Sequence, residues 1–203
     1  MRDDKKGIFL VVEGVDGSGK STQAARLADW LENRTGRETI RTAEPYILRK
    51  LILRRKDLNS LSEVLLFLAD RAEHVAKIIV PNLEAGNNIV CERYNDSTLA
   101  YQVGGHGVNL KQVENLISAC DFPAPDATVF FDISPEIAFE RVGARNNKLD
   151  KFEAEGLELI KKVSECYREH QKLFNWIRIF CDGLNEDEVF EKMISALLLE
   201  DLF

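Results

Sequence analysis

The sequence predicts an α/β fold in three layers, with a five-stranded parallel sheet in the middle and helices on both faces. Five short apolar runs alternate with longer segments of helical periodicity along the 203 residues. No internal repeat, low-complexity tract or Pro/Gly-rich linker separates them. Because strands connected through helices lie parallel and are covered on both sides, the alternation favours this fold. We therefore expect residues 1–203 to form a single domain.

The predicted elements follow one another along the chain. The apolar runs predict strands at 8–13, 39–43, 88–92, 127–133 and 176–181. Helical periodicity predicts helices at 20–33, 61–83, 110–120, 135–145, 153–174 and 186–199. The long helix 61–83 carries an apolar stripe that we expect to pack against the sheet. The stripe consists of Leu61, Leu65, Leu68, Ala72, Val75, Ala76 and Ile79.

Single residues agree with several of these helix boundaries. Ser134 precedes Pro135, a pair typical of a helix start, and its hydroxyl can accept a hydrogen bond from a free backbone N–H group. Asn109 and Asn185 stand at two further helix starts, and Gly86 follows the long helix as a stop.

Composition argues against several classes of protein. The chain has 27 Lys and Arg against 34 Asp and Glu, a net charge of -7. This charge argues against a nucleic-acid partner, because sequence-independent binding to nucleic acid needs clustered cations. The longest apolar run, at 8–12, is too short to span a membrane, and no signal peptide is visible. We therefore expect no membrane contact and a cytoplasmic location, with the four widely spaced cysteines reduced.

The most informative motif is a glycine-rich loop between the first predicted strand and the first predicted helix. Residues 14–21 read G-V-D-G-S-G-K-S and match the phosphate-loop pattern G-x-x-x-x-G-K-S. Backbone N–H groups of such a loop surround phosphate oxygens, and the following helix points its N-terminus at them. Lys20 can bridge the two outer phosphates of a nucleoside triphosphate, and the Ser21 hydroxyl can bind Mg²⁺. The residues expected to hold the nucleoside triphosphate are Gly14, Val15, Asp16, Gly17, Ser18, Gly19, Lys20 and Ser21.

A phosphate loop alone leaves motors, switches, transporter subunits and kinases open. Transfer of a phosphoryl group between two nucleotides brings polyanions together, so it needs several cations at one place. Arg93 directly follows the predicted strand 88–92, and we expect it near the phosphate loop because the carboxyl ends of parallel strands meet at one edge. Further candidate cations are Arg49, Arg71, Arg141, Arg145 and Lys148.

Three segments together resemble the thymidylate kinase family. They read E-G-V-D-G-S-G-K-S-T at 13–22, L-F-L-A-D-R-A-E-H at 66–74 and E-R-Y-N-D-S-T-L-A-Y-Q at 92–102. The resemblance extends over most of the chain, from about residue 8 to residue 181. It implies a homodimeric enzyme of the P-loop NTPase type that transfers the γ-phosphoryl group of MgATP to dTMP, with dTDP and ADP as products.

The same resemblance implies roles for single residues. Arg93 would hold the acceptor phosphate, Phe67 would stack on thymine, and Arg71 would hydrogen-bond the base. Tyr101 and Gln102 would shape the pocket for base and deoxyribose and leave no room for a ribose 2′-hydroxyl. The substrate-binding set implied in this way is Glu44, Arg49, Phe67, Arg71, Arg93, Ser97, Tyr101 and Gln102. Ser21 and Glu92 are the implied metal ligands.

Residues 143–153 resemble the mobile lid of this family. Members whose phosphate loop lacks an arginine supply one from the lid, and position 18 is serine here. The resemblance therefore implies that Arg145 stabilises the transition state, with Lys148 and Lys151 as helpers. Asp16 would lie near the sugar hydroxyl and the phosphate bridge. The implied catalytic residues are Lys20, Arg93, Arg145 and Asp16.

The chain departs from the family pattern at three places. Glu92 stands where aspartate is usual, so we expect an altered geometry at the metal. Residues 43–48 read A-E-P-Y-I-L where R-E-P-G-G-T is usual, so the grip on the acceptor phosphate is expected to depend on Arg49 and Arg93. His106 replaces a common arginine, and we expect it to be an exposed loop residue without a role.

Two other functions stay open at this point. A deoxynucleoside kinase would phosphorylate a neutral 5′-hydroxyl and would need a carboxylate base, for which Glu44 or Glu92 could serve. A non-catalytic nucleotide-binding switch module would need neither a base pocket nor a lid arginine. Arg145 and the segment 98–102 favour a nucleoside monophosphate acceptor, which needs cations and no base.

Overall fold

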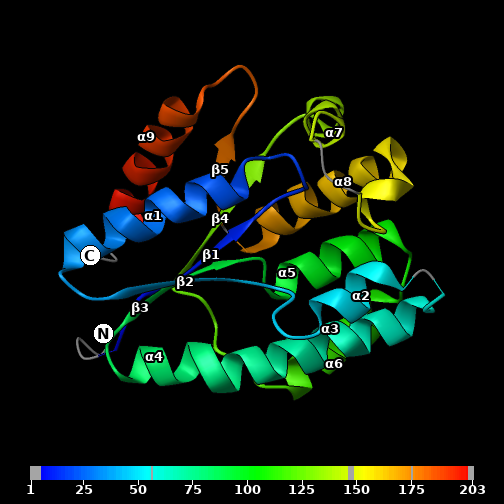
Figure 1. Cartoon of the computed structure of the whole chain (residues 1–203), viewed down its shortest axis with the longest axis horizontal. Coiled ribbons are helices and arrows are strands. Elements are labelled where there is room, and N and C mark those ends of the chain that lie inside the picture. The colour runs from blue at the N-terminus through cyan, green and yellow to red at the C-terminus, as the bar shows by residue number, and fades with distance from the viewer. Residues whose placement is uncertain (1–5, 56, 146–148, 175, 201–203) are drawn as a thin grey trace.

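A computed structural model describes residues 6–55, 57–145, 149–174 and 176–200. Its centre is one sheet of five parallel strands, as predicted, in the order β2-β3-β1-β4-β5 (Figure 1). The strands are β1 (Phe9–Glu13), β2 (Thr39–Ala43), β3 (Asn88–Glu92), β4 (Ala127–Asp132) and β5 (Ile177–Phe180). Each lies within one residue of its predicted bounds at either end. The three-layer α/β fold is therefore confirmed.

The helices lie between the strands and after β5. Those with α geometry are α1 (Lys20–Thr35), α2 (Arg49–Arg54), α3 (Ser60–His74), α4 (Val80–Glu84), α5 (Asn95–Thr98), α6 (Leu110–Ala119), α7 (Pro135–Gly143), α8 (Leu157–Phe174) and α9 (Glu186–Leu197). Two π-helical segments are η1 (Val75–Ile79) and η2 (Leu99–Gly105), and two 3₁₀ turns are η3 (Glu153–Glu155) and η4 (Leu198–Glu200). The predicted helix 61–83 is α3, η1 and α4 in succession. The predicted helix 153–174 is broken at Gly156, whose φ of 79° ends η3 before α8 begins.

Both faces of the sheet are apolar and covered. Leu10 and Val12 of β1 point to the side of α1, where they pack in one cluster with Leu27 and Leu31. Phe9 and Val11 point to the other side, where they pack with Leu83 and other residues of a second cluster. Figure 1 shows α1 and α9 above the sheet and α3, α4 and α6 below it. This double cover buries the central strand β1 along its whole length, whereas the edge strand β2 has no buried residue.

Two of the three predicted helix caps form as expected. The Asn109 side chain accepts from the N–H group of Gln112, and Asn185 with Glu188 forms a reciprocal capping box. The prediction for Ser134 is wrong in detail. Its hydroxyl donates to a carboxylate oxygen of Asp182 instead of accepting from the first turn of α7, because that acceptor lies beside it on the loop after β5.

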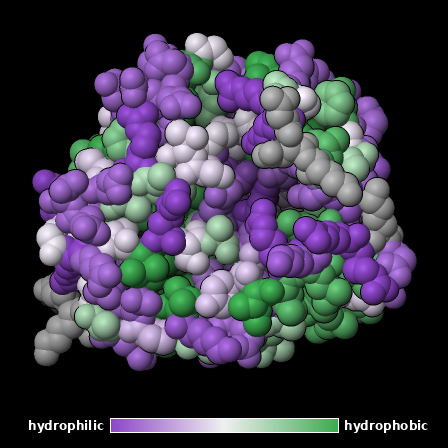
Figure 2. Space-filling view, in the orientation of Figure 1, coloured by the Kyte–Doolittle hydropathy of each residue, from purple (hydrophilic) through white to green (hydrophobic). Residues whose placement is uncertain are grey.

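The apolar stripe of the long helix divides into two parts. Leu68 and Ile79 are buried, as predicted, but Leu61 and Leu65 are exposed, Leu65 with 49% of its surface. Leu51 of α2 and Leu110 of α6 are exposed as well. Figure 2 shows apolar side chains gathered at the lower right, where Figure 1 places α2, α3 and α6. The N-terminal end of the stripe thus belongs to the surface and not to the packing against the sheet.

The strand order brings three chain segments to one edge of the sheet. β3 lies between β1 and β2, and the carboxyl ends of β1, β2 and β3 lead into the phosphate loop, into residues 44–48 and into Arg93. Ligands of open parallel sheets collect at this edge. Among the helices of the described ranges, none is both long enough and hydrophobic enough to cross a lipid bilayer.

Candidate active site

The phosphate loop closes tightly against helix α7. Gly17 has a φ of 87°, and a Cβ atom there would lie 2.4 Å from the carbonyl oxygen of Ala138. Gly19 has a φ of 91° at the N-terminal end of α1. Both values lie in the region that glycine adopts without strain. Glycine is therefore required at these positions for the loop to wrap with its N–H groups inward.

Lys20 is buried inside this loop. Its ammonium donates to the carbonyl oxygen of Val15 at 2.9 Å and lies 3.8 Å from the nearer carboxylate oxygen of Asp16. Burial and the positive charge of Arg93 lower the pKa of Lys20 to about 8, against the opposing effect of nearby carboxylates. A bound phosphate would add negative charge beside the ammonium and so favour its charged form.

Ser21 and Glu92 meet beside the loop. The Ser21 hydroxyl donates to the Oε1 atom of Glu92 at 3.0 Å, and both residues face the same cavity. A hydroxyl and a carboxylate are hard oxygen ligands of the kind that Mg²⁺ takes. The two predicted metal ligands therefore form a donor set that fits Mg²⁺, with Glu92 at the end of β3 reaching Ser21 in the first turn of α1.

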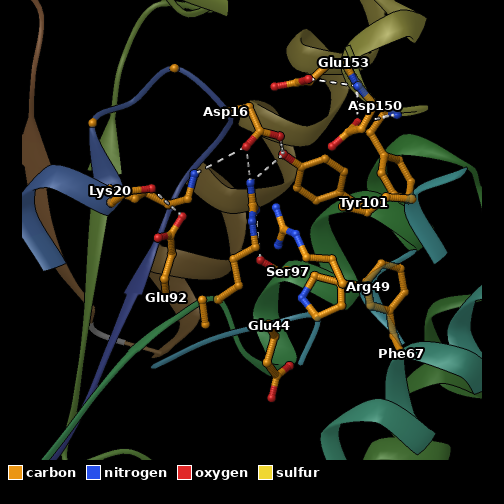
Figure 3. A pocket seen from close by; sticks show the side chains of 18 of the residues that line it. Asp16, Lys20, Glu44, Arg49, Phe67, Glu92, Ser97, Tyr101, Asp150 and Glu153 are labelled. Carbon is orange, nitrogen blue, oxygen red and sulfur yellow. Dashed lines mark hydrogen bonds and ion pairs between the residues drawn. The ribbon is translucent and has the colours of Figure 1, made fainter. Parts of the chain in front are cut away.

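Arg93 holds the centre of the site. Its guanidinium donates to Asp16 at 2.6 Å, to the Ser97 hydroxyl at 3.2 Å and to the Tyr101 hydroxyl at 3.3 Å. Although burial opposes the charge, Asp16 raises the pKa of Arg93 above its ordinary value. The backbone φ of Arg93 is 70°, a strained value for a residue with a side chain. Figure 3 shows Asp16 between Lys20 and Glu92 on one side and Tyr101 and Phe67 on the other.

Glu13, the last residue of β1, supports this arrangement from below. It is fully buried, and burial raises its pKa. Its carboxylate accepts from the backbone N–H groups of Tyr94 and Ser97, from the Ser97 hydroxyl and from the Tyr167 hydroxyl. The chain after Arg93 is thereby fixed against the phosphate loop. Sequence reasoning missed this residue, although a glutamate that ends a buried strand is itself a signal.

One cavity of about 450 Å³ collects most of the predicted residues. The predicted residues that line it are Asp16, Gly17, Gly19, Lys20, Ser21, Glu44, Arg49, Phe67, Glu92, Arg93, Ser97, Tyr101, Gln102 and Arg145. Arg49 is exposed at the cavity, and Figure 3 shows it beside the centre of the site. The loops after β1 and β2, together with α1, α2, α3, β3, α5 and η2, thus contribute residues to one hollow.

Gln102 faces the cavity with an unsatisfied amide. The residue is 0% exposed, and neither its Oε1 nor its Nε2 atom has a hydrogen-bond partner among the described residues. A buried amide without partners costs about 1 to 3 kcal/mol. Such a group is matched by a ligand that offers one donor and one acceptor side by side.

Arg71 is the predicted substrate residue that lies outside the cavity lining. Its guanidinium is 1% exposed and donates to Glu44, to Asn95, to the carbonyl oxygen of Tyr94 and to the Thr98 hydroxyl. In this structure Arg71 therefore braces the wall of the cavity, and its implied contact with the base stays a prediction. A buried arginine cannot be told from an exposed one by the sequence pattern alone.

A second hollow of about 450 Å³ lies on the other side of the phosphate loop. Arg141, Cys181 and the start of α9 line it, and it shares Gly17, Gly19, Thr22 and Arg145 with the first cavity. Arg141 also donates to the carbonyl oxygen of Gly17 at 3.4 Å. The loop therefore separates two hollows that could each take a nucleotide.

Part of the expected lid takes a different position. Residues 146–148, and with them Lys148, lie outside the described residues. Arg145 pairs with Glu153 at 3.3 Å and lines both hollows. Lys151 is buried and pairs with Glu63 of α3. It was expected to assist Arg145 at the transferring phosphoryl group, but in this structure its ammonium is held by α3 instead. His106 is only 16% exposed in its side chain and contacts Glu63 and Glu155, which corrects the expectation of an exposed loop histidine.

Comparison with known proteins assigns the chain to a family. The model of the thymidylate kinase family matches residues 12–194, nearly the whole described fold. The chain belongs to the thymidylate kinase family. The thymidylate kinase of Prochlorococcus marinus (strain AS9601) is 42% identical over 208 residues, which cover 95% of this chain and 96% of that protein. A probable thymidylate kinase of Pyrococcus abyssi is 36% identical over the same shares of the two chains. The crystal structure of thymidylate kinase from Ehrlichia chaffeensis superimposes with a TM-score of 0.75 at 29% identity, covering 95% of this chain and 99% of that one.

The departures from the usual thymidylate kinase pattern keep an ordered structure. The carboxylate of Asp70 accepts from the backbone N–H groups of Tyr46 and Leu48, at 2.6 Å for Leu48. Tyr46 also stacks on the ring of His74 at 4.9 Å. The segment that lacks two glycines is thus fixed against α3, and it places Arg49 at the start of α2.

We predict that Asp16→Asn makes stability less sensitive to acid. Burial opposes the charge of Asp16, but Arg93 and Lys20 lower its pKa below the ordinary value of about 4. The stabilisation is therefore complete above the unfolded-state pKa and is lost as the pH falls through the lower folded-state value. Between about pH 5 and pH 2, the free energy of unfolding of the wild type should fall more steeply than that of the variant. Urea denaturation at each pH measures this.

The control for that measurement is Asp29→Asn, on the exposed side of α1, which should keep the wild-type slope. Parallel curves for wild type and Asp16→Asn would contradict the ion pair with Arg93.

Proposed function

We propose that this protein works as a dTMP kinase, which transfers the γ-phosphoryl group of ATP to dTMP and forms dTDP and ADP. Membership of the thymidylate kinase family gives the reaction. The observation that carries the assignment to this site is the single cavity in which Lys20, Arg93 and Phe67 meet. Lys20 can bind the phosphates of ATP and Arg93 the phosphate of dTMP, while the ring of Phe67 in the same cavity can stack on the base.

The two hollows divide the substrates between them. The cavity with Phe67, Tyr101 and Gln102 suits the acceptor nucleotide, because it combines aromatic rings with a free amide. The hollow beside Arg141 and the start of α9 suits the nucleoside of ATP, because the phosphate loop forms its inner wall. With ATP there, its outer phosphates would pass over the loop toward Arg93, and the two nucleotides would face each other end to end.

The acceptor oxygen needs no base in this reaction. A phosphate oxygen of dTMP is already an anion, so its attack forms the new P–O bond as the bond from the γ-phosphorus to ADP breaks. Lys20 and Arg145 stand where they can neutralise the transferring group, and Arg93 can hold the acceptor phosphate. Asp16 holds the Arg93 guanidinium and accepts from the Tyr101 hydroxyl, so it fixes the direction of both side chains.

Mg²⁺ fits beside the loop and belongs to this proposal. The Ser21 hydroxyl and the Glu92 carboxylate would hold it, and the ion would neutralise charge on the β- and γ-phosphates when bound.

Base recognition follows from the free amide. Thymine presents an N–H donor next to carbonyl acceptors, and the Gln102 amide presents an acceptor and a donor in return. Phe67 offers a ring face for stacking, while the Tyr101 ring lies under the guanidinium of Arg93 at 5.0 Å and closes the sugar end of the cavity.

The deoxynucleoside kinase alternative would need Glu44 or Glu92 as its base. Glu44 is a buried bracing group, with one carboxylate oxygen held by Arg71 at 2.7 Å and the other by His74 at 3.1 Å. Glu92 accepts from the Ser21 hydroxyl, and we assign it to the metal site. A non-catalytic switch module needs to bind only one nucleotide, so this alternative does not explain the cavity lined by Phe67, Tyr101 and Gln102.

We also propose that residues 1–203 form a single domain, that two copies of the chain form a homodimer, and that the protein is cytoplasmic. The exposed leucines of α2, α3 and α6 form an apolar surface of the kind that a second copy covers. ATP and dTMP are the proposed small-molecule partners, and the cytoplasmic location rests on the family, whose members are typically cytoplasmic.

The test of the function is a coupled assay for ADP. MgATP is offered with dTMP, dUMP, dCMP, dGMP and thymidine in turn. We expect ADP to form with dTMP and not with thymidine, because thymidine has no phosphate for Arg93 to hold. ADP formation with thymidine, or ADP formation independent of any acceptor, would contradict the proposal.

We predict that Arg93→Ala lowers the turnover number roughly 100- to 1,000-fold while ATP binding stays within a factor of a few. The reason is that Arg93 faces the acceptor side of the cavity. Steady-state kinetics and titration with a fluorescent ATP analogue measure the two effects. Arg41→Ala, exposed on the edge strand β2, is the matched control. Unchanged turnover would remove Arg93 from the mechanism.

We also predict that Leu65→Glu separates the dimer. Light scattering after gel filtration should give twice 23.1 kDa for the wild type and 23.1 kDa for the variant. Leu199→Glu, at an exposed leucine of η4, should remain dimeric. A wild type that elutes as a monomer would refute the dimer.

A further inference from the structure

A buried cluster of charges ties the segment 149–155, here called the latch segment, to α3. Glu63 of α3 is 5% exposed, yet its Oε1 atom lies 2.5 Å from the ammonium of Lys151 and its Oε2 atom lies 3.3 Å from Nδ1 of His106. The Nε2 atom of His106 lies 3.1 Å from Glu155. The cluster therefore joins α3, the end of η2 and the latch segment through one carboxylate.

Further bonds hold the latch segment at the same place. The backbone N–H group of Lys151 donates to the carbonyl oxygen of Leu53, and its ammonium donates to the carbonyl oxygen of Arg55, both near the end of α2. Asp150 accepts from the backbone N–H groups of Phe152 and Glu153 and so closes a turn. Lys151 is thus the residue through which the latch segment is fixed to two helices.

This attachment places Phe152 in the wall of the acceptor cavity. Phe152 is 6% exposed and lines the cavity, with its ring centroid 6.2 Å from that of Phe67 and 5.5 Å from that of Tyr101. The ring of His106 stacks on Phe152 at 5.7 Å and does not itself line the cavity. Three rings from three elements therefore surround the part of the cavity that we assign to the base.

The charges of the cluster balance when His106 is protonated. Glu63 and Glu155 contribute two negative charges, and Lys151 contributes one positive charge. These are the charged groups that face the His106 ring from α3 and from the latch segment. The contacts with Glu63 and Glu155 raise the pKa of His106 above its ordinary value of about 6.5, against the effect of burial.

We infer that Glu63 is a positioning residue for the acceptor: by holding Lys151 and His106 it keeps Phe152 as a wall of the base pocket, and the hold is complete only when His106 is protonated. The inference rests on the proposed function. Phe152 closes the pocket by contact with Phe67 and Tyr101, so release of the latch segment removes one aromatic face from the base. Since the pKa of His106 is raised in the latched state, the hold is full below about pH 6.5 and weakens as the pH rises through that raised value.

The test compares Glu63→Gln and His106→Gln with Glu73→Gln. Glu73 is the matched control, because it lies on the same helix and pairs with Lys77 at 2.6 Å on the exposed side. We expect Glu63→Gln to raise the KM for dTMP about tenfold, more than the KM for ATP, and Glu73→Gln to change neither. His106→Gln should raise the KM for dTMP several-fold at about pH 6 and hardly at about pH 8.5.

A second measurement separates the latch from the titration of the substrate. Thymidine carries no phosphate, so the pH dependence of its binding reports on the protein. Calorimetry should find tighter thymidine binding at about pH 6 than at about pH 8.5 for the wild type and for Glu73→Gln, and no difference for His106→Gln. The ring signals of His106 in an NMR titration should show a lower pKa in Glu63→Gln than in the wild type.

The outcomes distinguish this inference from the proposed function. If the wild type forms ADP with dTMP but both latch variants behave like Glu73→Gln, the inference is overturned and the kinase stands. An unchanged NMR titration of His106 in Glu63→Gln overturns it as well, whatever the activity. If Glu63→Gln fails to fold because Lys151 is left buried without a partner, His106→Gln and the double variant Glu63→Gln/Lys151→Met carry the test. The double variant should regain stability and keep the raised KM for dTMP.

Discussion

The ion pair between Arg93 and Asp16 is the contact on which the rest of the site depends. It joins the loop after β1 to the loop after β3 at 2.6 Å, and it holds a strained arginine with a positive φ in place. Lys20 lies on the other side of the same carboxylate. Two cations that would repel each other are thus kept within one cavity by a shared anion. Incoming phosphates meet a site whose positive charges are already oriented, so little reorganisation is needed when the reaction begins.

A second layer of buried charge keeps this centre in position. Glu13 fixes the chain after Arg93, and Glu44 with Arg71 and His74 fixes the end of β2 against α3. Removal of one member of such a network leaves a buried charge without a partner, which costs several kcal/mol. Rigidity at the carboxyl edge of the sheet therefore comes from hydrogen-bonded ions, whereas the middle of the sheet is held by apolar packing on both faces.

Much of this could be predicted from the sequence, and the failures have a common physical cause. The strands, the phosphate loop and the place of Arg93 follow from local patterns, because periodicity and strand order decide them. The helices α2 and α5 and the segment η2 were not predicted, since they are short or end in glycines and carry no clear period. Lys151, His106 and Leu65 were given the wrong surroundings, because the neighbours of these side chains are decided by tertiary contacts with distant elements. The lid residues 146–148 and the roles of single site residues stay predictions.

The close approach of Gly17 to Ala138 has a mechanical consequence. With no side chain between them, the phosphate loop and α7 are in backbone contact, and α7 runs directly to Arg145. A tilt of that helix would press on the cradle of the donor phosphates, and a change in the cradle would tilt the helix. Movements of the phosphate loop and of α7 are therefore coupled through the contact at Gly17. The same movement of α7 would shift Arg145, the one arginine that borders both hollows in the described part of the lid.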